Sequence, residues 1–196
     1  GATFLFALTG ALAALRRGYD FIGVLALALG VGIGGGLLRD GVLISQTPAG
    51  LQDSRYLVAV AAAALIGMGF GARINRLRPV FDLLDAAGLG LYTVVGVQKG
   101  LAAGFGAPAA VLTGVVSAAG GGLLRDLLTR EEPLLFKPGH FYAAASIVGA
   151  AVFMVAIRAG APVQASAYVT IVLVFALRML SVWFNWRTAP LGDAPK

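Results

Sequence analysis

Long runs of apolar residues, separated by short segments rich in arginine, glycine or proline, fill almost the whole sequence. A helix needs about 20 apolar residues to cross the hydrocarbon core of a membrane, at about 1.5 Å of rise per residue. On that scale the pattern predicts an all-α polytopic membrane protein with seven transmembrane helices. The predicted spans are Ala2–Leu15, Phe21–Ile44, Tyr56–Ala72, Leu83–Ala103, Pro108–Leu128, Phe141–Ile157 and Val163–Trp186.

Composition narrows the class of protein further. Of the 196 residues, 59% are hydrophobic and 12% are charged, and the mean hydropathy is +0.87, values that exclude a soluble globule and a disordered chain. The formal charge of +6 does not indicate a nucleic-acid partner, because the basic residues lie between the apolar runs. With no cysteine, one histidine and no evident nucleophile–base pair, the sequence predicts no metal site, no cofactor and no enzyme.

The basic residues between the predicted spans are divided unequally between the two sides of the membrane. Cytoplasmic loops carry the excess of lysine and arginine, so the richer side is predicted to be cytoplasmic. The N-terminus then lies outside and the C-terminus inside. The richer side holds Arg16, Arg17, Arg73, Arg76, Arg78, Arg130, Lys137 and Arg187, whereas the other side holds Arg55 and Arg158.

One heptad occurs twice, letter for letter. GGGLLRD spans Gly34–Asp40 and again Gly120–Asp126, 86 positions later. The same offset pairs Leu5 with Leu91, Gly10 with Gly96, Leu15 with Leu101, Gly18 with Gly104 and Tyr56 with Tyr142. Each copy holds three spans, an odd number, so the second copy enters the membrane from the opposite side. The pattern predicts two inverted three-helix repeats, residues 1–81 and 82–160, followed by a seventh helix and a short tail in 161–196.

The glycine triplets of the heptad lie about midway along their apolar runs. Each glycine weakens a helix by about 0.8–1 kcal/mol relative to alanine, so we expect kinks in the second and fifth helices. A break that exposes carbonyls within a membrane survives only where it is buried or lines a wet cavity, which favours a permeation or binding site. The alternative is that these glycines serve close helix packing, as we expect for Gly96, Gly100 and Gly104. The six glycines of the predicted pore kinks are Gly34, Gly35, Gly36, Gly120, Gly121 and Gly122.

Charged residues within the spans are costly to insert and usually face the protein interior or water. Neighbours on a helix point about 100° apart, so Arg39 and Asp40, and likewise Arg125 and Asp126, are not expected to pair with each other. They either lock the helix break or form a charged gate. Lys99, beside Gln98, has no basic counterpart in the first repeat, which indicates a pathway residue or a side chain that reaches the membrane surface.

Other polar residues have plainer interpretations. Arg178 precedes Trp183 and Trp186, so we expect its side chain to reach the membrane interface. Asp82 and Asp85 open the fourth span, where helix N-termini favour acidic residues, or else attract cations to a pore mouth. His140 is expected to be an interfacial residue. Possible pore-lining hydroxyls and amides come from Tyr92, Gln98, Thr113 and Ser117, although packing explains each of them equally well.

The doubled GGGLLRD, with FALTGALAALRRGYDFIGVL in the first copy and LDAAGLGLYTVVGVQKGLAAG in the second, resembles the prokaryotic trimeric intracellular cation (TRIC) channels. The same bacterial domain is also known as a putative glycine transporter. The resemblance covers about residues 4–157, and the seventh span matches in position only.

This resemblance implies a homotrimer in the inner membrane of a prokaryote, with a pore through each protomer. It implies passive flow of monovalent cations, chiefly K⁺, past the kinked second and fifth helices, with K⁺ or Na⁺ as the bound species and lipids as the other partners. It assigns pore roles to Gly34–Asp40 and Gly120–Asp126, and with less weight to Lys99. The inverted repeat also suits a transporter of a small solute such as glycine, so both functions stay open.

Overall fold

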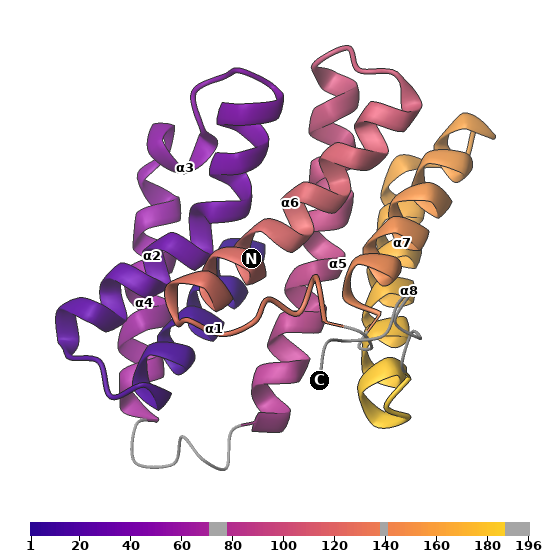
Figure 1. Cartoon of the computed structure of the whole chain (residues 1–196). Coiled ribbons are helices and arrows are strands. Elements are labelled where there is room, and N and C mark those ends of the chain that lie inside the picture. The colour runs from indigo at the N-terminus through magenta and orange to yellow at the C-terminus, as the bar shows by residue number, and fades with distance from the viewer. Residues whose placement is uncertain (71–77, 138–140, 187–196) are drawn as a thin grey trace, which may run out of the picture.

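The computed structural model describes residues 1–70, 78–137 and 141–186, and this part of the chain is helical throughout (Figure 1). One short π-helix, η1, directly continues α2. The elements in chain order are α1 (Ala2–Arg16), α2 (Phe21–Leu37), η1 (Leu38–Leu43), α3 (Ala49–Gln52), α4 (Ser54–Gly69), α5 (Arg78–Ala102), α6 (Ala107–Leu128), α7 (Tyr142–Arg158) and α8 (Val163–Trp183).

Four helical stretches are long and apolar enough to cross a membrane: Phe21–Leu43, Pro79–Ala102, Ala107–Leu128 and Val163–Trp183. Three further apolar helices, α1, α4 and α7, are shorter. Every predicted span thus coincides with an apolar helix. The helix bounds differ from the prediction at α3, which was not predicted, and at α5, which begins at Arg78, five residues before the predicted Leu83.

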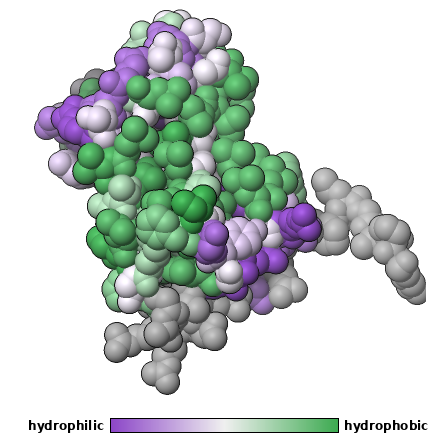
Figure 2. Space-filling model, turned by 90° about the vertical axis from the view of Figure 1, so that its left-hand side faces the viewer, coloured by the Kyte–Doolittle hydropathy of each residue, from purple (hydrophilic) through white to green (hydrophobic). Residues whose placement is uncertain are grey.

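The helices form two groups around a central pair (Figure 1). α1, α2 and α4 lie together on one side, α7 and α8 on the other, and α5 and α6 stand between them. α1 packs against α2, α4 and α5, while α6 packs against α2, α5 and α7. Figure 2 shows hydrophobic residues in a continuous band across the middle of one face, with hydrophilic residues toward its ends. This distribution is what a protein surrounded by lipid requires.

Equivalent glycines of the two copies make equivalent contacts. A Cβ on Gly10 would lie 2.8 Å from the carbonyl oxygen of Leu27, and a Cβ on Gly96 would lie 2.7 Å from that of Thr113. Thr113 follows Leu27 by the same 86 positions that separate the two glycines. These close approaches bring α1 against α2 and α5 against α6 in the same way, and small residues make them possible.

The glycine triplets lie where α2 crosses α6. A Cβ on Gly35 would overlap the carbonyl oxygen of Ser117, and a Cβ on Gly121 would lie 2.8 Å from the carbonyl oxygen of Val31. A Cβ on Gly120 would also lie 3.0 Å from the Cα of Gly35. These glycines therefore allow close packing of the two helix backbones. Close packing is the alternative that the sequence left open beside a permeation or binding site.

The kinks expected in the second and fifth helices stay a prediction. Both triplets lie inside continuous helix, Phe21–Leu37 and Ala107–Leu128. The irregular stretch follows in the first copy only, where η1 places the Arg39–Asp40 pair on a π-helical turn. Such turns are rare and are frequently found at functional sites. The glycines permit a close crossing, because their missing side chains leave room for the partner helix without breaking hydrogen bonds.

Candidate functional site

Two cavities enter the helix bundle from opposite ends, and each has one arginine of the repeated heptad in its wall. The first, called the Arg39 cavity, has a volume of about 380 Å³ and lies beside the start of α1 and the start of α4. The second, called the Arg125 cavity, has a volume of about 660 Å³ and lies beside the end of α1, the start of α5 and the end of α8. Among the residues that the structure describes, none lines both cavities.

The Arg39 cavity is mixed in character. Its wall includes Gly36, Arg39, Asp53, Tyr56, Ala59 and Tyr92. At its rim the exposed Arg55 donates hydrogen bonds to the Asp53 carboxylate, and these bonds lower the pKa of Asp53 below its ordinary value. Toward the interior the wall ends on Arg39, which is only 3% exposed.

Arg39 pairs with its own neighbour. Its Nε donates to Asp40 Oδ1 at 2.6 Å and its Nη2 to Asp40 Oδ2 at 3.0 Å, while Nη1 donates to Ser117 Oγ on α6 at 2.9 Å. The expectation that adjacent residues would not pair is wrong for Arg39–Asp40. The Cβ directions differ, but the long arginine side chain bends back, and the buried Asp40 carboxylate stabilises that geometry.

The Asp40 carboxylate accepts hydrogen bonds from two further donors. The Nζ of Lys99, on α5, lies 3.1 Å from Oδ2 and 3.3 Å from Oδ1, and the backbone N–H of Ala49 donates to Oδ2 at 3.0 Å. The Lys99 side chain is 37% exposed, so its ammonium group links the buried carboxylate to the surface. Lys99 is therefore paired, and Asp40 ties η1, α3 and α5 to one point.

The Arg125 cavity is lined by charges of both signs. Its basic residues are Arg16, Arg125, Lys137 and Arg178, and its acidic residues are Asp82, Asp126, Glu131 and Glu132. At one edge Arg17 donates to Glu131 at 2.8 Å, which joins the end of α1 to the segment after α6. The balanced charge allows a cation to approach without a strong barrier of either sign.

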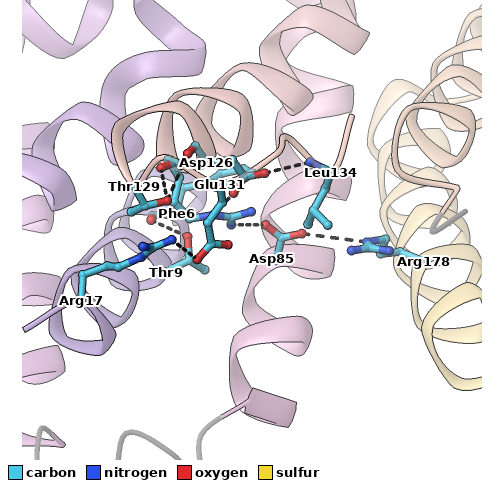
Figure 3. A network of polar contacts seen from close by, with 10 residues as sticks. Phe6, Thr9, Arg17, Asp85, Asp126, Thr129, Glu131, Leu134 and Arg178 are labelled. Carbon is cyan, nitrogen blue, oxygen red and sulfur yellow. Dashed lines mark hydrogen bonds and ion pairs between the residues drawn. The ribbon is translucent and has the colours of Figure 1, made fainter. Parts of the chain in front are cut away.

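Arg125 is held by two carboxylates (Figure 3). Its Nη1 donates to Asp85 Oδ1 at 2.7 Å, and its Nε donates to Asp126 Oδ1 at 2.9 Å. Asp126 Oδ2 in turn accepts from the backbone N–H of Leu134 at 2.9 Å. Arg125 and Asp126 therefore pair directly, again contrary to expectation, and this motif repeats the Arg39–Asp40 arrangement.

Asp85 and Arg178 differ from their expected roles. Asp85 lies two turns into α5, is 1% exposed, and bonds Arg125, so it is not a residue of an exposed helix N-terminus. Arg178 on α8 is 2% exposed, with its Nε 3.9 Å from Asp85 Oδ2 and its guanidinium 5.1 Å from the centre of the Tyr142 ring. It does not extend to the interface, because a buried carboxylate attracts it inward. Trp183 and Trp186, which follow it, are exposed.

The predicted pore-lining residues have different positions. Tyr92 lines the Arg39 cavity, and its hydroxyl donates to the carbonyl of Gly32 at 2.8 Å. Ser117 accepts from Arg39, whereas Thr113 donates to the carbonyl of Ala109 in its own helix at 2.7 Å. Gln98 is partly exposed on α5. The residues Arg73, Arg76, His140 and Arg187 lie outside the described part of the chain, as does the side chain of Arg78.

The region behind the Arg39 cavity is densely packed. The rings of Phe6 and Tyr92 are 5.4 Å apart, and a Cβ on Gly121 would lie 3.3 Å from Phe6.

Within the described residues, no group of three or more histidine, aspartate or glutamate side chains is arranged to hold a metal ion. The polar centres are therefore two arginine–aspartate clusters, one per cavity.

Sequence reasoning missed the joint role of Asp85 and Arg178. The available signal was charge within an apolar run: Arg178 lies well inside its predicted span and Asp85 near the start of another. The simplest explanation for these two charges is that Asp85 and Arg178 lie together in the protein interior.

Comparison with known proteins gives consistent matches. A family model described as "Glycine transporter" matches residues 1–72 and 82–158. A UPF0126 membrane protein of Deinococcus radiodurans is 34% identical over 192 residues, covering 97% of this chain and 88% of the relative. The UPF0126 inner membrane protein YadS of Escherichia coli is 30% identical over 187 residues, covering 94% and 90%.

Solved structures agree with these matches. The TRIC channel orthologue from Rhodobacter sphaeroides is 32% identical, with a TM-score of 0.87 over 93% of this chain and 94% of that one. A structure described as the basis for conductance through TRIC cation channels gives a TM-score of 0.88 at 26% identity, over 100% and 96% of the two chains. The chain is therefore an integral membrane protein of the prokaryotic family that contains the TRIC channel orthologues and whose family model is described as "Glycine transporter".

Proposed function

We propose that this protein is a passive channel for monovalent cations, chiefly K⁺, with a pathway through each protomer of a homotrimer. Two cavities that enter from opposite ends and stop at the two copies of one charged motif carry this proposal. The fold it shares with proteins described as TRIC cation channels supports it. The Arg39 cavity is the outer entrance and the Arg125 cavity the cytoplasmic one, as the distribution of basic residues predicts.

The pathway runs between α2 and α6, because these helices carry the two heptads and meet at Gly35 and Gly121. The conformation described here is closed, since tightly packed glycines and the Phe6–Tyr92 pair separate the cavities. The change in direction of α6 along its length, visible in Figure 1, supports a kinked helix that straightens or shifts when the pathway opens.

The arginine–aspartate clusters act as the gate. A cation that passes Arg39 or Arg125 needs the positive charge neutralised, and Asp40, Asp85 and Asp126 supply that neutralisation. Because the described residues form neither a carbonyl filter nor a ring of one charge, we expect discrimination among monovalent cations to be weak. The unit of 1–81 and the inverted unit of 82–160 each contribute one cluster, and α8 lies outside the repeat.

Exposed apolar side chains support contacts with lipid and with neighbouring protomers. Large apolar side chains are exposed along α4, α7 and α8, among them Leu65, Val155 and Val172. Lipid tails cover part of this surface and neighbouring protomers cover the rest. The structural neighbours are described as trimeric channels, and we assign the same assembly to this protein.

The proposal is tested by single-channel recording of the purified protein in a planar bilayer under a KCl gradient. We expect discrete current steps, because cation flow through a fixed pathway needs no coupled transport step. We expect the current to reverse near the K⁺ equilibrium potential, because the pathway carries cations. Liposome uptake of labelled glycine serves as the comparison. Absence of current, together with saturable glycine uptake, would contradict the channel function.

A second candidate function rests on the family model described as "Glycine transporter". An inverted repeat with sites near its centre also suits alternating access. In that case the Arg39 cavity, with a buried guanidinium for a carboxylate and Asp53 near its rim, would receive the solute.

A further inference from the structure

The two copies of the heptad have the same arginine geometry but unequal space around them. A Cβ on Gly36 would lie 3.6 Å from Arg39 Nη2, and a Cβ on Gly122 would lie 3.7 Å from Arg125 Nη2. No other atom lies within 4 Å of the Gly36 position. At Gly122, in contrast, the hydroxyl oxygen of Tyr142 would be only 2.6 Å away. One copy is open beside its third glycine, and the other is filled.

The filling residue has an equivalent in the other copy. Tyr142 follows Tyr56 by 86 positions, the offset of the repeat. Tyr56 is partly exposed and lines the Arg39 cavity together with Gly36. Tyr142 is 2% exposed, and neither it nor Gly122 lines the Arg125 cavity. The same tyrosine of the repeat therefore stands back from the glycine in one half and closes the space in the other.

Burial of Tyr142 requires an explanation, because its hydroxyl makes no hydrogen bond within the described part of the structure. A buried hydroxyl without a partner is unfavourable relative to a hydrated one. Something outside the repeat must therefore hold the ring in place. Arg178 of α8 supplies that contact: its guanidinium lies over the Tyr142 ring at 5.1 Å and its Nε faces Asp85 Oδ2 at 3.9 Å.

We infer that Arg178 is a positioning residue that holds Tyr142 against Gly122, and that it thereby keeps the space beside the third glycine of the inner heptad filled while the matching space beside Gly36 stays open. α8, the helix outside the two repeats, thus makes two equivalent halves different. The inference rests on the proposed function only in treating the two cavities as ends of one pathway. When Arg178 releases the ring, the inner half takes the open form already present around Tyr56.

The absence of cysteine from the sequence gives a direct test by thiol labelling. Ala59 lines the Arg39 cavity, and Ala145, its equivalent 86 positions later, is 2% exposed. The variants A59C and A145C are purified in detergent, so that both ends are accessible, and labelled with a charged methanethiosulfonate. Mass spectrometry gives the rates. We expect A59C to react about tenfold or more faster than A145C, because thiol access follows local opening.

The second step adds R178A to each cysteine variant. We expect labelling of A145C to rise about tenfold toward the rate of A59C, with A59C itself unchanged. A cysteine at Ala64, which is fully buried on α4, reports unfolding and should stay slow throughout. If R178A does not yield folded protein, R178Q replaces it, since that change removes the charge over the Tyr142 ring and keeps most of the side-chain volume. Y142A gives the labelling rate expected when the space is vacant.

Equal rates at A59C and A145C in the parent background would overturn the inference, as would slow labelling of A145C in folded R178A or R178Q. Labelling measures access of water-soluble reagent and needs no transport. Its outcome is therefore independent of whether the pathway carries a cation or another solute, and failure of the channel recordings would not imply failure here.

Discussion

Replacing Gly35 by alanine is expected to destabilise the protein by about 1–3 kcal/mol, whereas the same change at the neighbouring Gly36 should be tolerated. The new Cβ at position 35 would overlap the Ser117 carbonyl oxygen and approach the Gly121 nitrogen to 3.4 Å. Both are backbone atoms, so α2 and α6 must move apart. The thermal midpoint of the detergent-purified variant measures the loss.

The matched control, Gly36→Ala, adds the same methyl group to the same helix. Its Cβ would meet only Arg39 Nη2, at 3.6 Å, which is an ordinary contact. Alanine also favours helix over glycine by about 0.8–1 kcal/mol. Equal thermal midpoints for the two variants would show that the close crossing of α2 and α6 at Gly35 is absent.

Asp85→Asn is expected to cost about 3 kcal/mol or more of stability, because it removes one partner of the buried Arg125–Asp85 ion pair. Asp85 accepts from Arg125 at 2.7 Å and faces Arg178 at 3.9 Å, and all three side chains are almost fully buried. Arg125 keeps Asp126, but Arg178 loses the carboxylate beside it. Thermal unfolding in detergent measures the effect.

The control for Asp85→Asn is Glu131→Gln, at the edge of the same cavity. The Arg17–Glu131 pair is short, at 2.8 Å, but its side chains are 40% and 55% exposed. Exposed pairs contribute about 0–1 kcal/mol, so this variant should resemble the parent. Adding Arg178→Gln to Asp85→Asn should recover part of the loss, since it removes a buried charge. No recovery would argue against the Asp85–Arg178 contact.

Most of the helical fold follows from the pattern of the sequence. The apolar runs predict the apolar helices, four of which are long enough to cross a membrane, and the doubled heptad anticipates the matched contacts of Gly10 with Leu27 and Gly96 with Thr113. Helix ends were less predictable. α5 begins at Arg78, before the apolar run, because a helix can continue through polar residues such as Asp82 that lie outside a hydropathy boundary.

The site was predictable as a set of residues but not as a set of pairs. The heptad identified Arg39, Asp40, Arg125 and Asp126, yet the expected separation of neighbours on a helix failed because arginine reaches back along its own turn. The contact between α8 and the inner half depends on packing of elements far apart in the chain. No local pattern around Arg178 reports the carboxylate of Asp85.

The measurement that tests the cation pathway most directly is the single-channel current of A59C before and after labelling with a positively charged thiol reagent. Ala59 lines the Arg39 cavity, so the attached charge should reduce the K⁺ current about twofold or more. Thr47→Cys, exposed and outside the cavity, provides the control and should conduct unchanged. Full labelling of A59C with an unaltered current would contradict a pathway through this cavity.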